Sequence, residues 1–463
     1  MSETAAFRHI GQPLPRKEDR RLLTGRARFL DDIALPGTLH VAFVRSPHAH
    51  ARIAGIDMSA ARQMPGVVGI FTGEDLAAWT NPLQLAPPIE GLHPTTMATL
   101  PTDKVRFQGD PVACVVARDR YLAEDAVEAV LVDYEELPPI ADFAAALADG
   151  AALVDESLPS NLISAQTFSA GDVAARMAEA ERIVEARFVQ HRQTHVPIET
   201  RGCLADWDDG REHLTMHIGS QVPHPLRGQL AARLGLSEGQ VTVISPDVGG
   251  GFGQKIALYR EELTVAALSR HLGKPVRWRE DRLENLTSAS HAREQTCRTR
   301  AAVAADGRIL ALELEITEDF GAYCFYPANY MARVVAMILT GPYRISDYAF
   351  DVKVALTNKC GAGPMQFSRF DAMTLNFQDD KFVGWFLGDE AGAEFYSTVS
   401  GIGIGTTRAK ASASATVVDH KDSTLGEEFS LGTGDAAIGG MFAEPGKDAK
   451  IEALFAGANC FFR

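Results

Sequence analysis

The fold of this chain is constrained most strongly by one stretch, Val241-Thr242-Val243-Ile244-Ser245-Pro246-Asp247-Val248-Gly249-Gly250-Gly251-Phe252-Gly253-Gln254-Lys255. Its apolar first residues predict a strand, and the residues beyond it have helical spacing. Four glycines in five positions lie between them. Only residues without a Cβ allow such dihedrals and such close approach of the backbone. We therefore expect a strand, a loop and a helix. The loop either lies against a ligand or is a turn in which glycine merely supplies positive φ.

Two nucleotide-binding motifs are excluded by the spacing. A phosphate-binding P-loop requires Gly before the Lys and Ser or Thr after it, whereas Lys255 lies between Gln254 and Ile256. A dinucleotide fingerprint that begins at Gly249 requires Gly at position 254, where the chain has Gln.

The N-terminal part of the chain has an α+β pattern. Short β-like runs occur at residues 39–44, 67–71, 111–117 and 129–134, with a helical pattern at 119–129. The Ala-rich segment 141–165 loses periodicity at 158–161, which is typical of a connection between domains.

Strands predominate from about residue 166 to 358. We expect strands at 181–189, 214–218, 241–245, 298–304 and 309–317 and helices at 226–234 and 259–272. Gly235 and Gly273 follow the two helices as C-terminal caps, and Asp306-Gly307 is a typical hairpin turn.

The pattern changes after Lys359. The last hundred or so residues are rich in Gly, Ala, Ser and Thr, with β-like alternation at 381–386 and 394–399. Three interpretations remain open: a small extra β unit, the product of a shifted reading frame, or a poorly ordered end.

Composition narrows the class of protein. The 463 residues are 46% hydrophobic and carry a formal net charge of −15, which argues against nucleic acid as a partner. No apolar run reaches the ~18 residues of a membrane span, and the N-terminus has no signal-peptide pattern, so we expect a cytoplasmic protein without a membrane partner. The six cysteines are scattered, without CxxC, so we expect neither a zinc site nor an iron-sulfur cluster in this chain. The histidines, too, lack metal-site spacing.

Several segments, in order, resemble the molybdenum-pterin (large) subunit of the xanthine dehydrogenase and aldehyde oxidase family. Its GGGFGxK signature is similar to 249–255. The other matching segments are Gly25-Arg26-Ala27-Arg28-Phe29, Arg45-Ser46-Pro47-His48-Ala49-His50, Phe107-Gln108-Gly109-Asp110-Pro111, Asp133-Tyr134-Glu135-Glu136-Leu137-Pro138, Pro197-Ile198-Glu199-Thr200-Arg201-Gly202-Cys203, Gly219-Ser220-Gln221-Val222-Pro223-His224 and Gly273-Lys274-Pro275-Val276-Arg277-Trp278. The resemblance covers roughly residues 15–359.

The resemblance implies an α+β fold and a division of the chain. An N-terminal arm at 1–24 would precede an α/β hammerhead-like domain at 25–145, a linker at 146–165 and a first, mixed α/β molybdopterin-binding domain at 166–359. The atypical tail at 360–463, of uncertain fold, would stand where the family has its second cofactor domain.

The resemblance also implies chemistry. Family members hydroxylate aldehydes or N-heterocycles with oxygen from water, and electrons pass to iron-sulfur and FAD-binding subunits. The cofactor is molybdenum-molybdopterin, of which the cytosine dinucleotide form is one alternative, and no flavin is expected in this chain. Pterin sulfurs hold the metal, so no side-chain ligand is expected.

The cofactor-binding residues implied by the resemblance are Gln221, Gly250, Gly251, Phe252 and Gly253. Phe252 and Gly253 would pack at the metal's oxo group, and the neutral amide of Gln221 would donate to another oxygen ligand without titrating.

Two neighbouring residues bear on the ligand. Lys255 is either a counter-charge to a cofactor phosphate or a helix-start lysine. Purine-oxidising members have an acidic residue where this chain has Ile256, so purines are disfavoured.

The family's general-base Glu is not found, so the catalytic residue stays unknown; Glu444 lies beside Pro445-Gly446 but does not match that motif. Cys360 is not assignable to the copper loop of carbon monoxide dehydrogenase. Two hypotheses follow: an oxidoreductase subunit whose isolated chain is incomplete and inactive, or a truncated or rearranged non-catalytic binding or assembly module.

Overall fold

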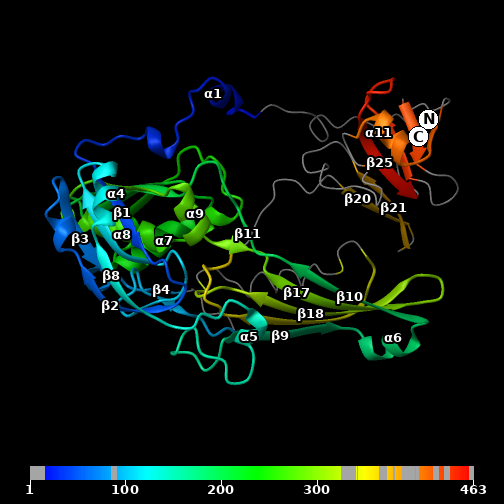
Figure 1. Ribbon diagram of the computed structural model, residues 1–463, viewed down its shortest axis with the longest axis horizontal. Helices are drawn as coiled ribbons and strands as arrows, with labels where there is room; N and C mark the ends of the chain where they lie inside the picture. Colours follow the sequence, from blue (N-terminus) through cyan, green and yellow to red (C-terminus); the bar gives the residue numbers. More distant parts are fainter. Residues whose placement is uncertain are drawn as a thin grey trace.

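The computed structural model describes residues 16–84, 91–324, 340, 343–363, 373–378, 381–387, 402, 406–420, 427–431 and 438–457. Figure 1 shows a main body, an arm of long strands and a separate C-terminal unit.

A seven-stranded mixed sheet forms the centre of the main body. In spatial order its strands are β14 (Val241–Ile244), β13 (His213–Ile218), β12 (Gly202–Asp208), β15 (Val276–Arg279), β1 (Leu39–Arg45), β7 (Pro111–Ala117) and β3 (Val67–Thr72). Strand β1 pairs in parallel with β15, with Leu39 opposite Val276. The two segments predicted as separate domains therefore share one sheet. Local periodicity does not reveal a pairing between residues so far apart in sequence.

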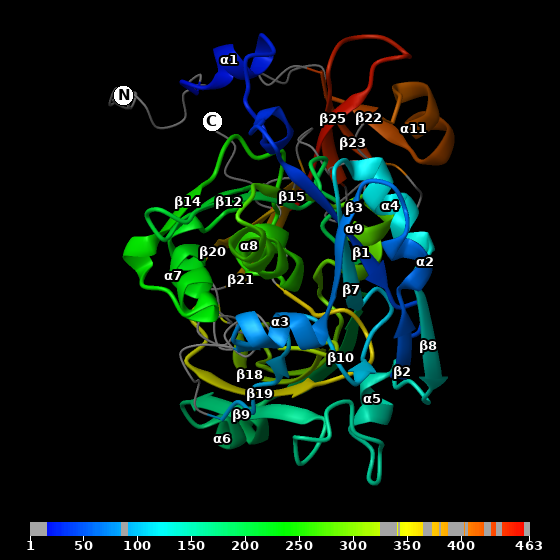
Figure 2. The same ribbon diagram turned by 90° about the vertical axis from the view of Figure 1, so that its left-hand side faces the viewer.

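Helices cover both faces of this sheet. The fully buried strand β7 alternates: Cys114 and Val116 face the main core, and Ala113 and Val115 face a second core. The main core packs against α7 (Pro223–Leu234) and α8 (Arg260–Leu272), which lie together in Figure 2, and the second against α4 (Arg120–Glu128). The continuous apolar run at residues 111–117 thus forms a strand that is buried on both faces of the sheet.

The remaining elements of the main body are short. The helices are α1 (Asp19–Leu23), η1 (Leu30–Asp32), α2 (Ser59–Arg62), α3 (Gly73–Trp79), α5 (Phe143–Ala146), η2 (Glu238–Gln240), η3 (Gln254–Ile256) and α9 (Arg282–Ser288). The small sheets are β6 (Lys104–Val105), β2 (Ala51–Asp57) and β8 (Leu131–Glu136); β4 (Leu83–Gln84) with β5 (Thr96–Met97); and β11 (Gln193–Thr194) with β16 (His291–Ala292).

The arm is a five-stranded sheet. Its strands are, in order, β10 (Arg182–Gln190), β17 (Gln295–Val303), β18 (Ile309–Asp319), β19 (Asp347–Ala355) and β9 (Leu162–Ala170), with α6 (Val173–Glu179) beside them. The predicted hairpin is confirmed, with Gly307 at φ 85° in its turn. Strand β9 begins inside the segment predicted as a linker.

The predicted helix ends are confirmed. Gly235 and Gly273 cap α7 and α8 in the left-handed region, at φ 65° and 60°. The predicted helix at 119–129 is α4, whose N-terminal amide at Leu122 donates to the Asp119 carboxylate.

The C-terminal unit is an antiparallel six-stranded sheet. Its order is β20 (Met373–Gln378), β21 (Lys381–Leu387), β25 (Ile451–Gly457), β24 (Ile438–Phe442), β23 (Glu427–Leu431) and β22 (Val417–Asp419), with α11 (Arg408–Ser414). Among the strands that the structure describes, these six pair only with one another, and Phe429 and Phe442 stack in a small core of the unit. The strand predicted at 381–386 is β21, and the one at 394–399 lies outside the described residues.

Candidate cofactor site

The glycine loop, defined here as residues 249–253, connects the end of β14 to η3 and α8. Gly250 and Gly253 have φ of 99° and 100°. Phe252 has φ of 51°, a conformation that costs a residue with a side chain about 1–3 kcal/mol. The residue as a whole is 38% exposed. Backbone strain of this kind is concentrated at binding sites.

Two side chains occupy the space that the missing Cβ atoms leave. An ideal Cβ on Gly249 would lie 2.6 Å from the Cβ of Glu199, and one on Gly251 would lie 2.5 Å from Oε1 of Gln221. The close approach expected from the glycines is thus, at these two positions, an approach to the protein's own side chains.

Gln221 and Glu199 bind the loop backbone. The Gly253 amide donates to Gln221 Oε1 at 2.9 Å, and the Gln221 amide nitrogen of the main chain donates to the Lys255 carbonyl at 2.9 Å. The Gly249 amide donates to Glu199 Oε2 at 2.9 Å, and the Glu199 amide donates back to the Gly249 carbonyl at 3.1 Å. The structure therefore brings Gln221 together with Gly251 and Gly253 of the predicted loop residues.

Three consecutive loop amides are left over. Within the described part of the chain, the N–H groups of Gly250, Gly251 and Phe252 have no hydrogen-bond acceptor. Successive unpaired amides in a loop with alternating φ signs form a concavity that suits an anionic oxygen or phosphate. The donor set of the loop, three unpaired backbone amides, thus fits an anionic group of a cofactor.

Lys255 is buried and paired with a side chain of the protein itself. It lies inside η3 with a side chain only 2% exposed, and its ammonium forms an ion pair with Glu199 Oε2 at 2.8 Å. Burial lowers the pKa of Lys255, although Glu199 opposes this. Local sequence patterns contain no signal for this pair, because its partners are 56 residues apart.

A buried charge network is centred on Arg201. The Arg201 guanidinium donates to Glu280 and Glu261 and lies 3.9 Å from the centroid of the Tyr259 ring. Burial would raise the pKa of Glu261, but Arg201 and Arg45 lower it to about 2. Breaking such a pair leaves an uncompensated buried charge and typically costs about 3–5 kcal/mol.

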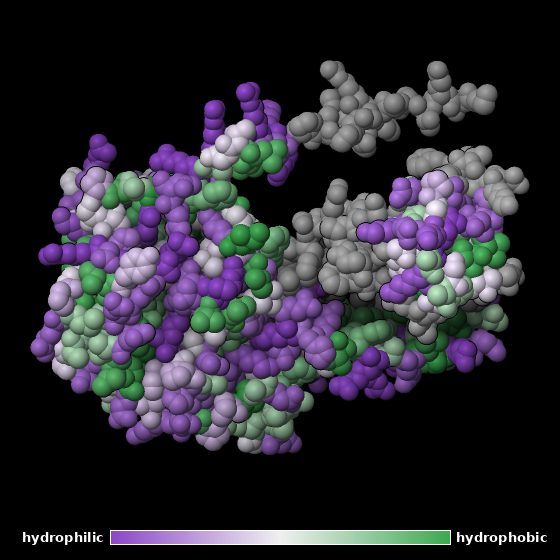
Figure 3. All heavy atoms as spheres, turned by 45° about the horizontal axis from the view of Figure 1, so that its top comes forward, coloured by the Kyte–Doolittle hydropathy of each residue, from purple (hydrophilic) through white to green (hydrophobic). Residues whose placement is uncertain are grey.

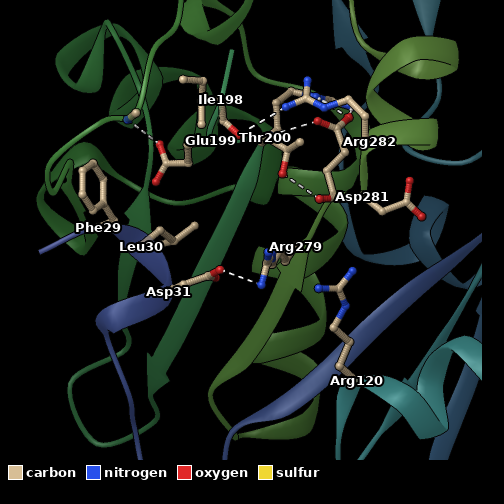
Figure 4. A pocket seen from close by; sticks show the side chains of 13 residues that line it. Phe29, Leu30, Asp31, Arg120, Ile198, Glu199, Thr200, Arg279, Asp281 and Arg282 are labelled. Carbon is tan, nitrogen blue, oxygen red and sulfur yellow. Dashed lines mark hydrogen bonds and ion pairs between the residues drawn. The ribbon is translucent and has the colours of Figure 1, made fainter. Parts of the chain in front are cut away.

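A cavity of about 570 Å³ adjoins the loop at Gly249 and Glu199 (Figure 4). Across it, Asp31 of η1 forms an ion pair with Arg279 at 2.8 Å. The Arg282 guanidinium points toward residues 197 and 198 and donates to the Pro197 and Ile198 carbonyls. The Ile198 side chain is 94% exposed. On the face shown in Figure 3, hydrophobic side chains gather below the N-terminal segment.

Other predicted candidates lie elsewhere. Glu444 is in an exposed turn between β24 and β25, and Cys360 is buried, which raises the pKa of its thiol to about 11. Five cysteines in the described ranges are free thiols. No group of three His, Cys, Asp or Glu side chains there is arranged to hold a metal ion. No helix in the same ranges is long and apolar enough to cross a membrane.

Comparison with known proteins identifies the family of two segments of this chain. Residues 24–138 match the aldehyde oxidase and xanthine dehydrogenase a/b hammerhead domain, and residues 154–370 match the molybdopterin cofactor-binding domain. This chain belongs to the xanthine dehydrogenase family of molybdopterin-binding large subunits.

Individual relatives are similar over the same part of the chain. The nicotine 6-hydroxylase large subunit of Paenarthrobacter nicotinovorans is 40% identical over 79% of this chain and 45% of its own length. The carbon monoxide dehydrogenase large chain of Hydrogenophaga pseudoflava is 38% identical over 75% and 44%. The crystal structure of quinoline 2-oxidoreductase from Pseudomonas putida 86 superposes with a TM-score of 0.73 at 39% identity, over 76% of this chain and 45% of that one. This chain therefore spans less than half the length of these relatives.

Proposed function

We propose that this chain binds the molybdenum-molybdopterin cofactor of an oxidoreductase that hydroxylates aldehydes or N-heterocycles with water-derived oxygen. The observation that carries the proposal is the run of three unpaired amides at Gly250, Gly251 and Phe252 on a strained, partly exposed loop. Charge-assisted hydrogen bonds from backbone amides to an anion are stronger than those between neutral groups.

The cofactor, when bound, supplies the two-electron oxidation and the site at which oxygen from water reaches the substrate carbon. The residues of this chain would position that cofactor. The Gln221 carboxamide fixes the far end of the glycine loop, and the loop amides would face the anionic group. The Phe252 ring, exposed beside them, would exclude water from that group.

The substrate class is part of the proposal. One similar protein is named a nicotine 6-hydroxylase and another a quinoline 2-oxidoreductase, and both substrates are N-heterocycles. Ile256 has no polar group with which to anchor a purine. We accordingly propose small aldehydes or non-purine heterocycles as substrates, with the cytosine dinucleotide form as one alternative for the cofactor.

The partners are proposed from the same family. Electrons would leave through an iron-sulfur subunit and an FAD-binding subunit, and we place this complex in the cytoplasm. The division into an arm, a hammerhead-like domain, a linker and a first cofactor domain with the boundaries given above stays part of this proposal, as do the five cofactor-binding residues.

A second candidate function is a non-catalytic binding or assembly module. It is favoured by one observation: Glu444, the tail carboxylate considered as a general base, lies in an exposed turn of a sheet with its own core. Positioned general-base catalysis typically contributes about 10²–10⁴-fold, so its loss alone would make turnover slow.

One experiment separates the two. The chain is co-produced with iron-sulfur and flavin subunits in a host that makes the cofactor, bound molybdenum and pterin are measured, and oxidation of aldehydes and of quinoline-type heterocycles is followed with an artificial electron acceptor. Bound cofactor with turnover supports the enzyme, and bound cofactor without turnover supports the module. Absence of both pterin and molybdenum contradicts the proposed function.

A further inference from the structure

Glu199 occupies an unusual place relative to the glycine loop. It lies just before β12, about fifty residues from the loop in sequence, and its carboxylate is only 21% exposed. A single oxygen, Oε2, accepts from the Gly249 amide at 2.9 Å and from the Lys255 ammonium at 2.8 Å. The two donors flank the run of unpaired amides, one at the start of the loop and one two residues beyond its end.

The backbone strengthens the first of these attachments. The Glu199 amide donates to the Gly249 carbonyl, so Gly249 is held both by the main chain and by the side chain of Glu199. The absent Cβ of Gly249 is what allows this approach, because an ideal Cβ there would lie 2.6 Å from that of Glu199. The attachment of Gly249 to Glu199 therefore requires a side-chain oxygen at position 199 and a residue without a Cβ at position 249.

The second attachment depends on charge. The Lys255 side chain is 2% exposed, and the carboxylate of Glu199 is the acceptor at its ammonium. A buried ammonium without an anion is strongly disfavoured, so Lys255 adopts this position because Glu199 is there. Since Lys255 is already neutralised and faces inward, it is poorly placed to balance a phosphate outside the loop.

We propose that Glu199 is the positioning residue of the glycine loop. Its single carboxylate holds both Gly249 and Lys255, and this fixes the amides of Gly250, Gly251 and Phe252 in the arrangement that receives the anionic cofactor. The inference rests on the proposed function for the identity of the ligand. The two attachments themselves are independent of it, so they are testable without cofactor.

The test uses three variants of the whole chain, Glu199→Gln, Lys255→Met and the double variant. Gln at position 199 retains an oxygen for the Gly249 amide and loses the charge that holds Lys255. Glu313→Gln is the matched control, because Glu313 is 31% exposed and pairs with Arg300 on the arm, away from the loop. Hydrogen exchange of the peptide covering 249–255 and the melting temperature are measured for each, and molybdenum per chain is measured in the complex.

We expect each single variant to raise exchange of the loop peptide at least tenfold, and the control to leave it unchanged. The double variant removes the unpaired buried charge, so its melting temperature returns toward that of the wild type. Its loop exchange stays raised and its molybdenum content stays low, because the second attachment is still absent.

Two results would overturn the proposal. One is loop exchange in folded Glu199→Gln and Lys255→Met within twofold of the wild type. The other is recovery of loop exchange together with the melting temperature in the double variant, which would give Glu199 only a charge-balancing role. If Glu199→Gln does not fold, Lys255→Met and the double variant decide. Failure to find molybdenum even in the wild type would contradict the proposed function, whereas the exchange result would stand.

Discussion

Gln221 and Gly253 are joined by a hydrogen bond of 2.9 Å across 32 residues of sequence, with the Gly253 amide donating to the Gln221 side-chain carbonyl. The glycine loop is folded around this carboxamide, since the same oxygen lies 2.5 Å from the position that a Cβ of Gly251 would take. The amide that the family resemblance assigns to the cofactor is thus also a structural support of the loop that would contact it.

Replacing Gln221 by Ala should loosen the loop without unfolding the protein. The buried Gly253 amide would lose its acceptor, which typically costs about 1–3 kcal/mol. Chemical denaturation should show a loss of this size, and hydrogen exchange at 249–255 should rise. Gln63→Ala, at the exposed residue that follows α2, should change neither quantity. Equal effects of the two substitutions would mean that Gln221 does not support the loop.

Gly251→Ala tests the close approach directly. The new methyl group would lie 2.5 Å from Gln221 Oε1, so either the carboxamide or the loop must move, at a cost of about 1–3 kcal/mol. Gly55→Ala is the control, because nothing lies within 4 Å of its ideal Cβ and its φ is not positive. The free energy of unfolding should fall for the first variant and stay within about 0.5 kcal/mol for the second. A neutral Gly251→Ala would disprove this packing.

The buried Glu262 gives the protein a predictable pH dependence. Burial raises the pKa of its carboxyl from 4.5 to about 8, so between these values the folded state holds a proton that the unfolded state has lost. The contribution of Glu262 to stability is therefore full below pH 4.5 and is lost as the pH rises toward 8. The slope is at most about 1.4 kcal/mol per pH unit.

Glu262→Gln removes this titration while it keeps an oxygen for the Tyr259 amide, which donates to Glu262 at 2.9 Å. Relative to the wild type, the variant should gain stability between about pH 5 and about pH 8, as measured by urea unfolding at each pH. A difference that does not change with pH would show that Glu262 is ionised throughout.

Limited proteolysis should distinguish the main body from the C-terminal unit. The main body has a continuous core, to which residues near Ala362 still bind through the Phe320 carbonyl, whereas the six-stranded sheet has a small core of its own. The first cuts should fall beyond about residue 363, leaving a stable fragment from the main body. Early cuts between 166 and 358 would contradict this order of stability.

The elements with a strong local signal were predictable from sequence. Val241–Ile244, the glycine loop and Gly273 after α8 each follow from local dihedral or periodicity rules. What was not predictable depends on long-range pairing: β1 beside β15, Lys255 on Glu199, and Arg201 between two glutamates. Charged residues at 260–262 suggest an exposed helix start, yet all three are buried, and Arg260 and Glu261 have their charge partners, Asp110 and Arg201, in distant segments.

The assignment of the glycine loop to the cofactor is tested most directly by the molybdenum content of the chain. For this measurement, the chain is purified with iron-sulfur and flavin subunits from a host that makes the cofactor. Gly253→Val places a β-branched residue at a φ of 100°, which such residues avoid, whereas Gly55→Ala leaves the loop untouched. We predict molybdenum above background in the wild type, the same amount in Gly55→Ala, and at least tenfold less in Gly253→Val. Equal molybdenum in the wild type and Gly253→Val, or no more in the wild type than in an unrelated protein, would contradict the assignment of the glycine loop to the cofactor.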